Sequence, residues 1–291
     1  MGGMKRYLAA VVQLSCTSDE EANLAQAEAL IRRAAGYGAQ LVATPENTNY
    51  LGPHREKVRR AEPVGGALTQ RMGALARELS IHLLMGSFNE ATSDPRRCAN
   101  TSVVFGPDGA VLGCYRKIHL FDVDVSDEVR FKESDTVVPG TEPVVVPTDL
   151  GGLGLSICYD LRFPELYQAL VEGGAELLAV PAAFTATTGK AHWMPLLRAR
   201  AIENQCWVIA PGQVGSHDDG GLRESHGHSC IIDPWGVVVA EAADGPGLAL
   251  AEIDLERVAA VRRGMPVVAH RRLPRGGRRA SASSAPGGRT C

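Results

Sequence analysis

Long apolar runs are missing from this sequence of 291 residues. Its longest apolar stretches, such as residues 8–14 and 177–184, are far shorter than the ~18 residues that span a bilayer. The first of them follows two basic residues but is not followed by a small-residue cleavage pattern, so we interpret it as a first strand rather than a signal peptide. We therefore expect no membrane association and predict a cytoplasmic protein.

A surplus of positive charge is also missing. The chain has 30 Lys and Arg residues against 33 Asp and Glu residues, which gives a net charge of −3. This balance leaves no overall positive field for binding a phosphate backbone, so we expect no nucleic-acid partner.

Cysteine and histidine do not form the usual disulfide or metal-binding patterns. The seven cysteines are an odd, widely spaced set without a Cys-x-x-Cys pair, which favours buried thiols over a disulfide framework or a zinc site. His217, His226 and His228 have only Glu224 at a useful spacing, which is too small a ligand set for zinc. We expect no bound metal.

The composition is that of a globular domain followed by a tail. With 45% hydrophobic and 22% charged residues, the chain can bury a large core, and we assign residues 1–270 to one domain. Residues 271–291 contain six Arg and no acidic residue among many Gly, Ser and Pro, so we expect a disordered tail. The tail is interpreted as a solvated extension, with a specific anionic partner as the alternative.

Strand-like and helix-like segments alternate along the chain, which predicts two β-sheets covered by helices. Helices are expected after a capping box formed by Ser18 and Glu21, and at residues 68–79, 164–172, 192–204 and 255–262. Strands are expected at residues 6–14, 41–44, 83–88, 101–105, 110–115, 153–157, 176–180, 206–210, 228–232, 237–241 and 248–253. The polar residues 117–142 show neither the helical nor the strand period of apolar residues, so a loop is expected there. A loop of that length in a compact domain is usually functional or disordered.

Cys158 has the surroundings of a nucleophile. An apolar strand runs directly into it, and Pro164 opens a helix a few residues later, so the thiol is expected on a tight turn at the carboxyl edge of a sheet. Helix N–H groups favour the reactive thiolate, and the N–H of Tyr159 would point at a substrate oxyanion. Taken alone, however, a cysteine at a strand end is more often a small buried hydrophobic residue.

Two further residues complete a chemical set. Glu46 follows the strand at 41–44, and Lys117 comes immediately after another strand. Either residue alone has an ordinary structural explanation, but a thiol, a carboxylate and a cation together suffice for acyl transfer. A papain-like Cys-His enzyme stays open as an alternative, with His119 or His192 as the histidine.

Three segments carry a family resemblance. The sequences PEN at 45–47, YRKIHLFD at 115–122 and CYDLRFPE at 158–165 closely resemble the Glu, Lys and Cys blocks of the nitrilase superfamily of carbon-nitrogen hydrolases. The resemblance covers roughly residues 5–275. It implies an α/β fold, the four-layer α-β-β-α sandwich of that superfamily, assembled into a homodimer or a higher homo-oligomer and working without a metal or an organic cofactor.

The closer likeness is to the Nit branch of the superfamily. It rests on residues 131–134, 187–193, 197–205, 227–229 and 233–236, and residues 197–203 and 265–272 look more like the deaminated glutathione amidases than the omega-amidases. The resemblance implies an amidase for linear amides that bear a carboxylate, acting through a Cys158 thioester and releasing ammonia and a carboxylic acid. Alternatives are an omega-amidase acting on 2-oxoglutaramate or 2-oxosuccinamate, a nitrilase or carbamoyl hydrolase, and a catalytically silent binding protein.

The same resemblance implies roles for individual residues. Glu46, Lys117 and Cys158 would be the catalytic triad and Glu133 a second catalytic carboxylate, while Lys117 and the N–H of Tyr159 would form the oxyanion hole. Arg162 would bind a substrate carboxylate and Thr188 would help to hold the substrate. As structural alternatives, Arg162 would pair with Asp160 or Glu165, and Thr188 would cap the helix that contains His192.

Overall fold

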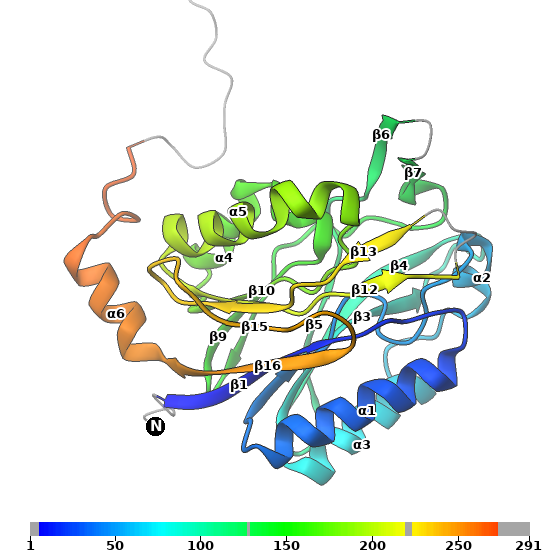
Figure 1. Ribbon diagram of the computed structural model, residues 1–291, viewed down its shortest axis with the longest axis horizontal. Coiled ribbons are helices and arrows are strands. Elements are labelled where there is room, and N and C mark those ends of the chain that lie inside the picture. The colour runs from blue at the N-terminus through cyan, green and yellow to red at the C-terminus, as the bar shows by residue number, and fades with distance from the viewer. Residues whose placement is uncertain (1–5, 127–128, 219–222, 273–291) are drawn as a thin grey trace, which may run out of the picture.

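The computed structural model describes residues 6–126, 129–218 and 223–272. Two six-stranded sheets form its centre (Figure 1). The first sheet has the order β16-β1-β2-β3-β4-β5, with strands β1 (Arg6–Gln13), β2 (Leu41–Ala43), β3 (His82–Ala91), β4 (Cys98–Phe105), β5 (Val111–Arg116) and β16 (Gly247–Asp254). The second sheet has the order β15-β14-β11-β10-β9-β8, with strands β8 (Val145–Thr148), β9 (Gly151–Leu155), β10 (Leu177–Ala179), β11 (Trp207–Ala210), β14 (Cys230–Ile232) and β15 (Val238–Glu241).

Helices cover the outer face of each sheet (Figure 1). On the first sheet lie α1 (Glu20–Gly36) and α3 (Ala67–Leu79), and on the second lie α4 (Pro164–Glu172) and α5 (Ala186–Asn204). The result is a four-layer α-β-β-α sandwich, which confirms the fold class expected from the sequence. Shorter elements complete the structure: α2 (His54–Arg59), α6 (Leu255–Gly264), the 3-10 turns η1 (Glu133–Asp135) and η2 (Cys158–Arg162), and two small ribbons formed by β6 (Asp122–Ser126) with β7 (Val129–Lys132) and by β12 (Val214–Ser216) with β13 (Glu224–His226).

The layers follow from the alternation of side chains along strands. In β1, Ala9 and Val11 join a core cluster that is shared with the second sheet, whereas Ala10 and Val12 pack in the cluster under α1 and α3. A strand whose two faces are both apolar is buried on both sides. The near-continuous apolar sequence of β1 therefore places it inside the sandwich.

Several local predictions were incomplete or wrong. The capping box at Ser18 does not form, because α1 begins one residue later, with Asp19 as its N-cap accepting a hydrogen bond from the Ala22 N–H at 3.0 Å. The hydroxyl of Ser18 instead contacts the carboxylate of Asp218. Helix α5 begins at Ala186 rather than at residue 192, and residues 117–142 contain β6, β7 and η1 instead of an irregular loop. Helix α2 and the ribbon of β12 and β13 were not predicted.

The expected tail lies almost entirely outside the described residues, since residues 273–291 are not among them. Its disorder and the domain boundary at residue 270 therefore remain predictions. Within the described part of the chain, no helix is both long and apolar enough to cross a bilayer.

Candidate active site

The residues proposed from the sequence come together in one pocket. Glu46 follows β2, Lys117 follows β5, Glu133 opens η1, and Cys158 follows β9 and opens η2. All four line a cavity of about 490 Å³, open solvent at its mouth included, and so do Tyr159, Arg162 and Thr188. These residues are far apart in sequence but close in space, because the strand ends that they follow, in both sheets, meet at one edge of the sandwich.

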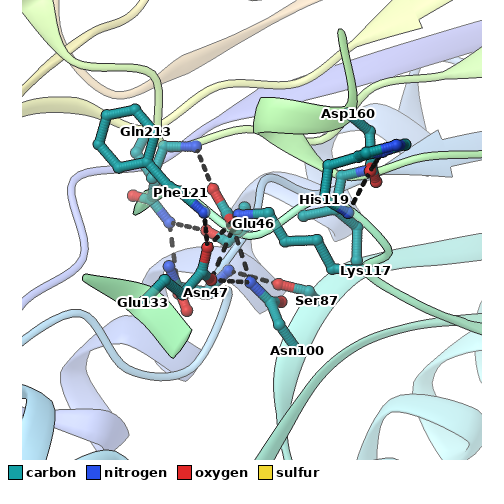
Figure 2. Close-up of polar contacts among 12 residues, drawn as sticks. Glu46, Asn47, Ser87, Asn100, Lys117, His119, Phe121, Glu133, Asp160 and Gln213 are labelled. Atoms are coloured by element: carbon teal, nitrogen blue, oxygen red, sulfur yellow. Dashed lines mark hydrogen bonds and ion pairs between the residues drawn. The ribbon is translucent and has the colours of Figure 1, made fainter. Parts of the chain in front are cut away.

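An ammonium group between two carboxylates forms the centre of the pocket (Figure 2). The Nζ of Lys117 lies 2.9 Å from Oε1 of Glu46 and 2.9 Å from Oε2 of Glu133. All three side chains are almost completely buried. Buried charges are tolerated when they are paired and hydrogen-bonded, and this arrangement meets both conditions.

Backbone and amide donors hold the two carboxylates in place. Glu46 accepts a hydrogen bond from the N–H of Ala183 at 2.8 Å, and Glu133 accepts one from the N–H of Phe121 at 2.7 Å. The side-chain amide of Asn100 reaches both carboxylates, at 2.8 Å for Glu46 and 3.3 Å for Glu133 (Figure 2). Because Ala183 belongs to the second sheet's half of the chain, Glu46 is fixed by both halves of the sandwich.

A close backbone contact positions the strand end before Glu46. A Cβ added at Gly86 would lie 1.9 Å from the carbonyl oxygen of Thr44 and 2.4 Å from that of Pro45. Only glycine fits at this distance. Gly86 thereby allows the backbone of residues 44–45, just before Glu46, to pack directly against β3.

The electrostatics keep the acids ionised and the lysine charged. Burial opposes ionisation of Glu46, but the Lys117 ammonium offsets it, so that the pKa of Glu46 lies below its usual value. The same balance of burial and the Lys117 charge lowers the pKa of Glu133 to about 2. Burial disfavours the Lys117 ammonium, yet Glu133 and Glu46 together raise the pKa of Lys117 well above its ordinary value.

The thiol of Cys158 sits on a strained turn. Its φ is 49°, in the left-handed region that non-glycine residues rarely adopt, and its N–H donates to the carbonyl of Pro181 at 2.9 Å. Such strain persists where the surrounding structure over-determines the conformation, often at functional sites. Burial, followed by the negative charge of Glu46, raises the pKa of Cys158 well above its usual value. The resting thiol therefore carries its proton and faces an ionised carboxylate.

Asp160 stabilises the turn that carries Cys158, a role that was not predicted from the sequence. Its carboxylate is fully buried and accepts hydrogen bonds from the N–H of Ile157 at 2.9 Å and from the Tyr115 hydroxyl at 2.8 Å. It also accepts the N–H of His119 at 3.0 Å and lies 2.7 Å from the Nδ1 of that residue. Asp160 therefore connects the Cys158 turn to the end of β5, where Lys117 lies.

A cysteine-histidine pair does not form with either candidate histidine. His119 is bound to Asp160 and stacks on Phe163 at 3.7 Å between ring centroids, while Nδ1 of His192 lies 3.3 Å from the Arg162 guanidinium. Neither histidine lines the pocket. Glu46, by contrast, lines the pocket with Cys158 and interacts with its thiol.

The remaining predicted residues surround the thiol. Among the residues that the structure describes, no group accepts a hydrogen bond from the N–H of Tyr159. Arg162 lies over the rings of Tyr159 and Phe184, at 5.7 and 5.1 Å from their centroids, and pairs with neither Asp160 nor Glu165. The hydroxyl of Thr188 lies 2.8 Å from that of Thr185. Both side chains are thus placed to contact a ligand, and the structural alternative in which Arg162 pairs with Asp160 or Glu165 is not found.

Several other residues of the pocket were not predicted from the sequence. They include the basic residues His54, Lys57 and Arg223 of the lining. Asn100, which contacts both carboxylates from β4 without lining the pocket, was missed as well. Burial, followed by the neighbouring Lys57 charge, lowers the pKa of His54 to about 4, so its ring is neutral near pH 7. No sequence signal marked the three basic residues, because neither α2, which carries His54 and Lys57, nor β13, which begins directly after Arg223, was predicted.

Comparison with known proteins agrees with this geometry. The model of the carbon-nitrogen hydrolase family matches residues 8–263. A deaminated glutathione amidase of Synechocystis is 46% identical over 271 residues, which are 92% of this chain and 99% of the relative. The omega-amidase NIT2 of Homo sapiens is 40% identical over 271 residues, covering 92% of this chain and 96% of the relative. The crystal structure of the Caenorhabditis elegans NitFhit protein is similar with a TM-score of 0.87 and 41% identity, covering 93% of this chain and 66% of that one.

Proposed function

The chain belongs to the carbon-nitrogen hydrolase family and is an amide-hydrolysing enzyme, and from this premise we propose that Cys158 is its nucleophile, with Glu46, Lys117 and Glu133 as the other catalytic residues. The observation that carries the proposal is the placement of an ionised Glu46 and a charged Lys117 in one pocket with a protonated Cys158 thiol. A nucleophile with an adjacent base and a cation is the set that acyl transfer requires.

The reaction proceeds in two halves. Glu46 takes the thiol proton as the sulfur of Cys158 attacks the amide carbon, and it returns that proton to the nitrogen as the carbon-nitrogen bond breaks. A water molecule then attacks the thioester, gives its proton to Glu46, and the thiol is restored with a carboxylic acid as product. A primary amide releases ammonia, whereas an N-substituted amide releases the corresponding amine.

Positive charge stabilises both tetrahedral intermediates. The Lys117 ammonium and the uncommitted N–H of Tyr159 would face the oxyanion, and the loss of one such donor costs about 10²- to 10³-fold in rate. Glu133 keeps Lys117 in position, since it binds Nζ at 2.9 Å, and it polarises the second water. Thr188 contributes to holding the substrate from the start of α5.

We propose deaminated glutathione as the substrate, with 2-oxoglutaramate and 2-oxosuccinamate as the alternatives. Support comes from the relatives of these two names and from Arg162, whose guanidinium lines the pocket without an acidic partner among the described residues. A guanidinium binds a carboxylate through two parallel hydrogen bonds, so it selects amides that also carry an acid group.

A direct assay tests this assignment. Purified enzyme is incubated with deaminated glutathione, with 2-oxoglutaramate and with an uncharged nitrile; 2-oxoglutarate is followed for the first two, and ammonia for the nitrile. We expect both amides to be hydrolysed, with deaminated glutathione preferred in kcat/KM. Turnover of the nitrile alone would refute the amidase assignment, and an absence of turnover on all three would favour the silent binding protein.

We further propose a cytoplasmic homodimer. The free thiols at six described cysteines suit a reducing compartment. Large exposed hydrophobic side chains on and beside the second sheet's half offer an apolar surface for a second copy: Ile202, Trp235, Val237, Val239 and Met265. Light scattering on the eluting protein should give twice the mass of the chain, and a monomer at micromolar concentration would contradict the proposal.

A further inference from the structure

The pocket contains a buried lysine that the proposed mechanism does not use. Lys57 lies on α2, is 3% exposed, and lines the pocket together with Cys158. Among the residues that the structure describes, no acceptor hydrogen-bonds its ammonium and no carboxylate lies within ion-pair distance. Lysine is almost never buried without a partner, because a desolvated charge is costly. The partner of Lys57 is therefore to be sought in what enters the pocket.

The fold directs Lys57 inward. Helix α2 turns one face to the pocket, carrying His54 and Lys57 three residues apart, while the side chain of Arg59 is 77% exposed. The ring of His54 lies 6.3 Å from that of Phe131. Figure 1 shows α2 at the same end of the sandwich as β6 and β7, which lead to Glu133. Lys57 thus belongs to the pocket wall rather than to the outer surface.

The nearby acids are already engaged. Both Glu46 and Glu133 are bound to Lys117 at 2.9 Å. They lie beyond ion-pair distance from the Lys57 ammonium and attract it only at longer range. Burial, followed by the positive charge of Arg223, lowers the pKa of Lys57. The guanidinium of Arg223 lies 5.3 Å from the centroid of the Phe131 ring, on the pocket lining. An entering anion would meet both of these basic side chains on the pocket lining, and its negative charge would favour the protonated form of Lys57.

A second cation without an acidic partner, Arg162, comes from the other half of the sandwich. It lies four residues after Cys158 in the same η2 turn, whereas Lys57 comes from the connection between β2 and β3. An acyl group bound to Cys158 stays next to η2, so a carboxylate on that acyl group falls within the range of Arg162. A carboxylate on the departing amine is not held next to η2, which leaves Lys57, on the lining from the first sheet's half of the chain, to receive it.

From this arrangement we propose that Lys57 forms a second anion subsite and binds a carboxylate on the amine portion of the substrate, while Arg162 binds the carboxylate of the acyl portion. The substrate class is therefore an N-substituted amide with one acid group on each side of the scissile bond. This inference rests on the proposed amidase function and sharpens it. Deaminated glutathione has such a distribution, because its cysteinylglycine portion ends in a carboxylate, whereas 2-oxoglutaramate has no acid on the nitrogen side.

The test compares two substrates that differ in one charge. Deaminated glutathione and its C-terminal carboxamide are assayed by the release of 2-oxoglutarate with the wild-type enzyme, with Lys57→Met, and with Lys190→Met as the matched control. Lys190 is an exposed lysine on α5 outside the pocket lining. For the wild type and the control we expect the acid to exceed the carboxamide in kcat/KM by about tenfold to a hundredfold, mostly through KM. For Lys57→Met we expect this ratio to fall to near one.

The outcomes separate the two proposals. If the wild type hydrolyses the acid and the carboxamide with equal kcat/KM, the subsite is refuted while the amidase function stands, and this comparison requires no variant to fold. Equal ratios for the wild type and a folded Lys57→Met also refute the subsite. If neither compound is hydrolysed, the proposed function itself fails. A thermal melt adds a structural control, because loss of an unpaired buried ammonium should not lower the Tm.

Discussion

Replacement of Glu133 by Gln tests how the central ion network is held together. The wild-type carboxylate accepts hydrogen bonds from Lys117, from the N–H of Phe121 and from the amide of Asn100. Gln has nearly the same shape, so it adds no cavity, but it removes the negative charge next to Lys117. That ammonium is 2% exposed and would retain Glu46 as its one acidic partner.

The expected loss is large. Breaking a buried ion pair from one side costs about 3–5 kcal/mol, because the other charge stays buried with less compensation. The shift in the pKa of Glu133, from 4.5 to about 2, corresponds to roughly 3 kcal/mol, in agreement with that range. We also expect kcat to fall about a hundredfold, since Lys117 would no longer be fixed against Glu46.

Urea unfolding followed by fluorescence measures the loss, and Asp135→Asn is the matched control. Asp135 lies two residues away and pairs with Lys132 at 3.3 Å, but both side chains are more than 60% exposed. Exposed pairs contribute about 0–1 kcal/mol. Equal urea midpoints for Glu133→Gln and Asp135→Asn, together with an unchanged kcat, would show that the buried network is not what stabilises the site.

The pH dependence provides an independent check on the same variant. Because folding lowers the pKa of Glu133, its stabilisation is complete above about pH 4.5 and is lost as the pH falls towards about 2. The difference in unfolding free energy between the wild type and Glu133→Gln should therefore narrow as the pH is lowered from about 5 to about 3. A difference that stays constant over this interval would contradict the assigned ionisation.

Three further substitutions probe separate parts of the site. Glu46→Gln should lower kcat by about 10²- to 10⁴-fold in steady-state assays, and retained turnover would show that Glu46 is not the base. Arg162→Met should raise KM for 2-oxo acid amides by about tenfold or more, and an unchanged KM would contradict its role as the carboxylate ligand. Asp160→Asn should lower the free energy of unfolding by about 2 kcal/mol in urea unfolding. It should also lower kcat more than it raises KM, because the loosened turn misplaces Cys158. A wild-type kcat would contradict this role of Asp160.

Element order could be predicted from the sequence wherever one physical signal dominated. The alternation of apolar strands with amphipathic helices located α3, and Pro164 marked the first residue of α4. Short elements without a strong period escaped, because α2 and β13 have six and three residues. Their stability comes from tertiary packing, of α2 on β3 and of β13 on α5 and β12, which local sequence does not encode.

The residues of the candidate site also fall into those that the sequence predicted and those that it did not. Glu46, Lys117 and Cys158 were predictable because each lies within three residues of the carboxyl end of a strand, and the carboxyl ends of strands form clefts. Asn100 and Asp160 were not, since one lies inside β4 and the other follows the nucleophile without a distinguishing pattern. Their importance lies in hydrogen bonds that cross 54 and 45 residues of sequence. Only the assembled sheets bring those partners within reach.

The charges of the pocket fall into two groups with different tasks. Lys117 binds both buried acids, so Glu46 is ionised before substrate arrives while Cys158 keeps its proton. In the mechanism that we propose, the thiol loses this proton to Glu46 when a carbonyl carbon is placed against the sulfur. Arg162 and Lys57 have no acidic partner among the described residues, and under the proposed assignment the carboxylates of the substrate become their partners. Binding energy gained at these cations, away from the reacting bond, can then position the amide for attack.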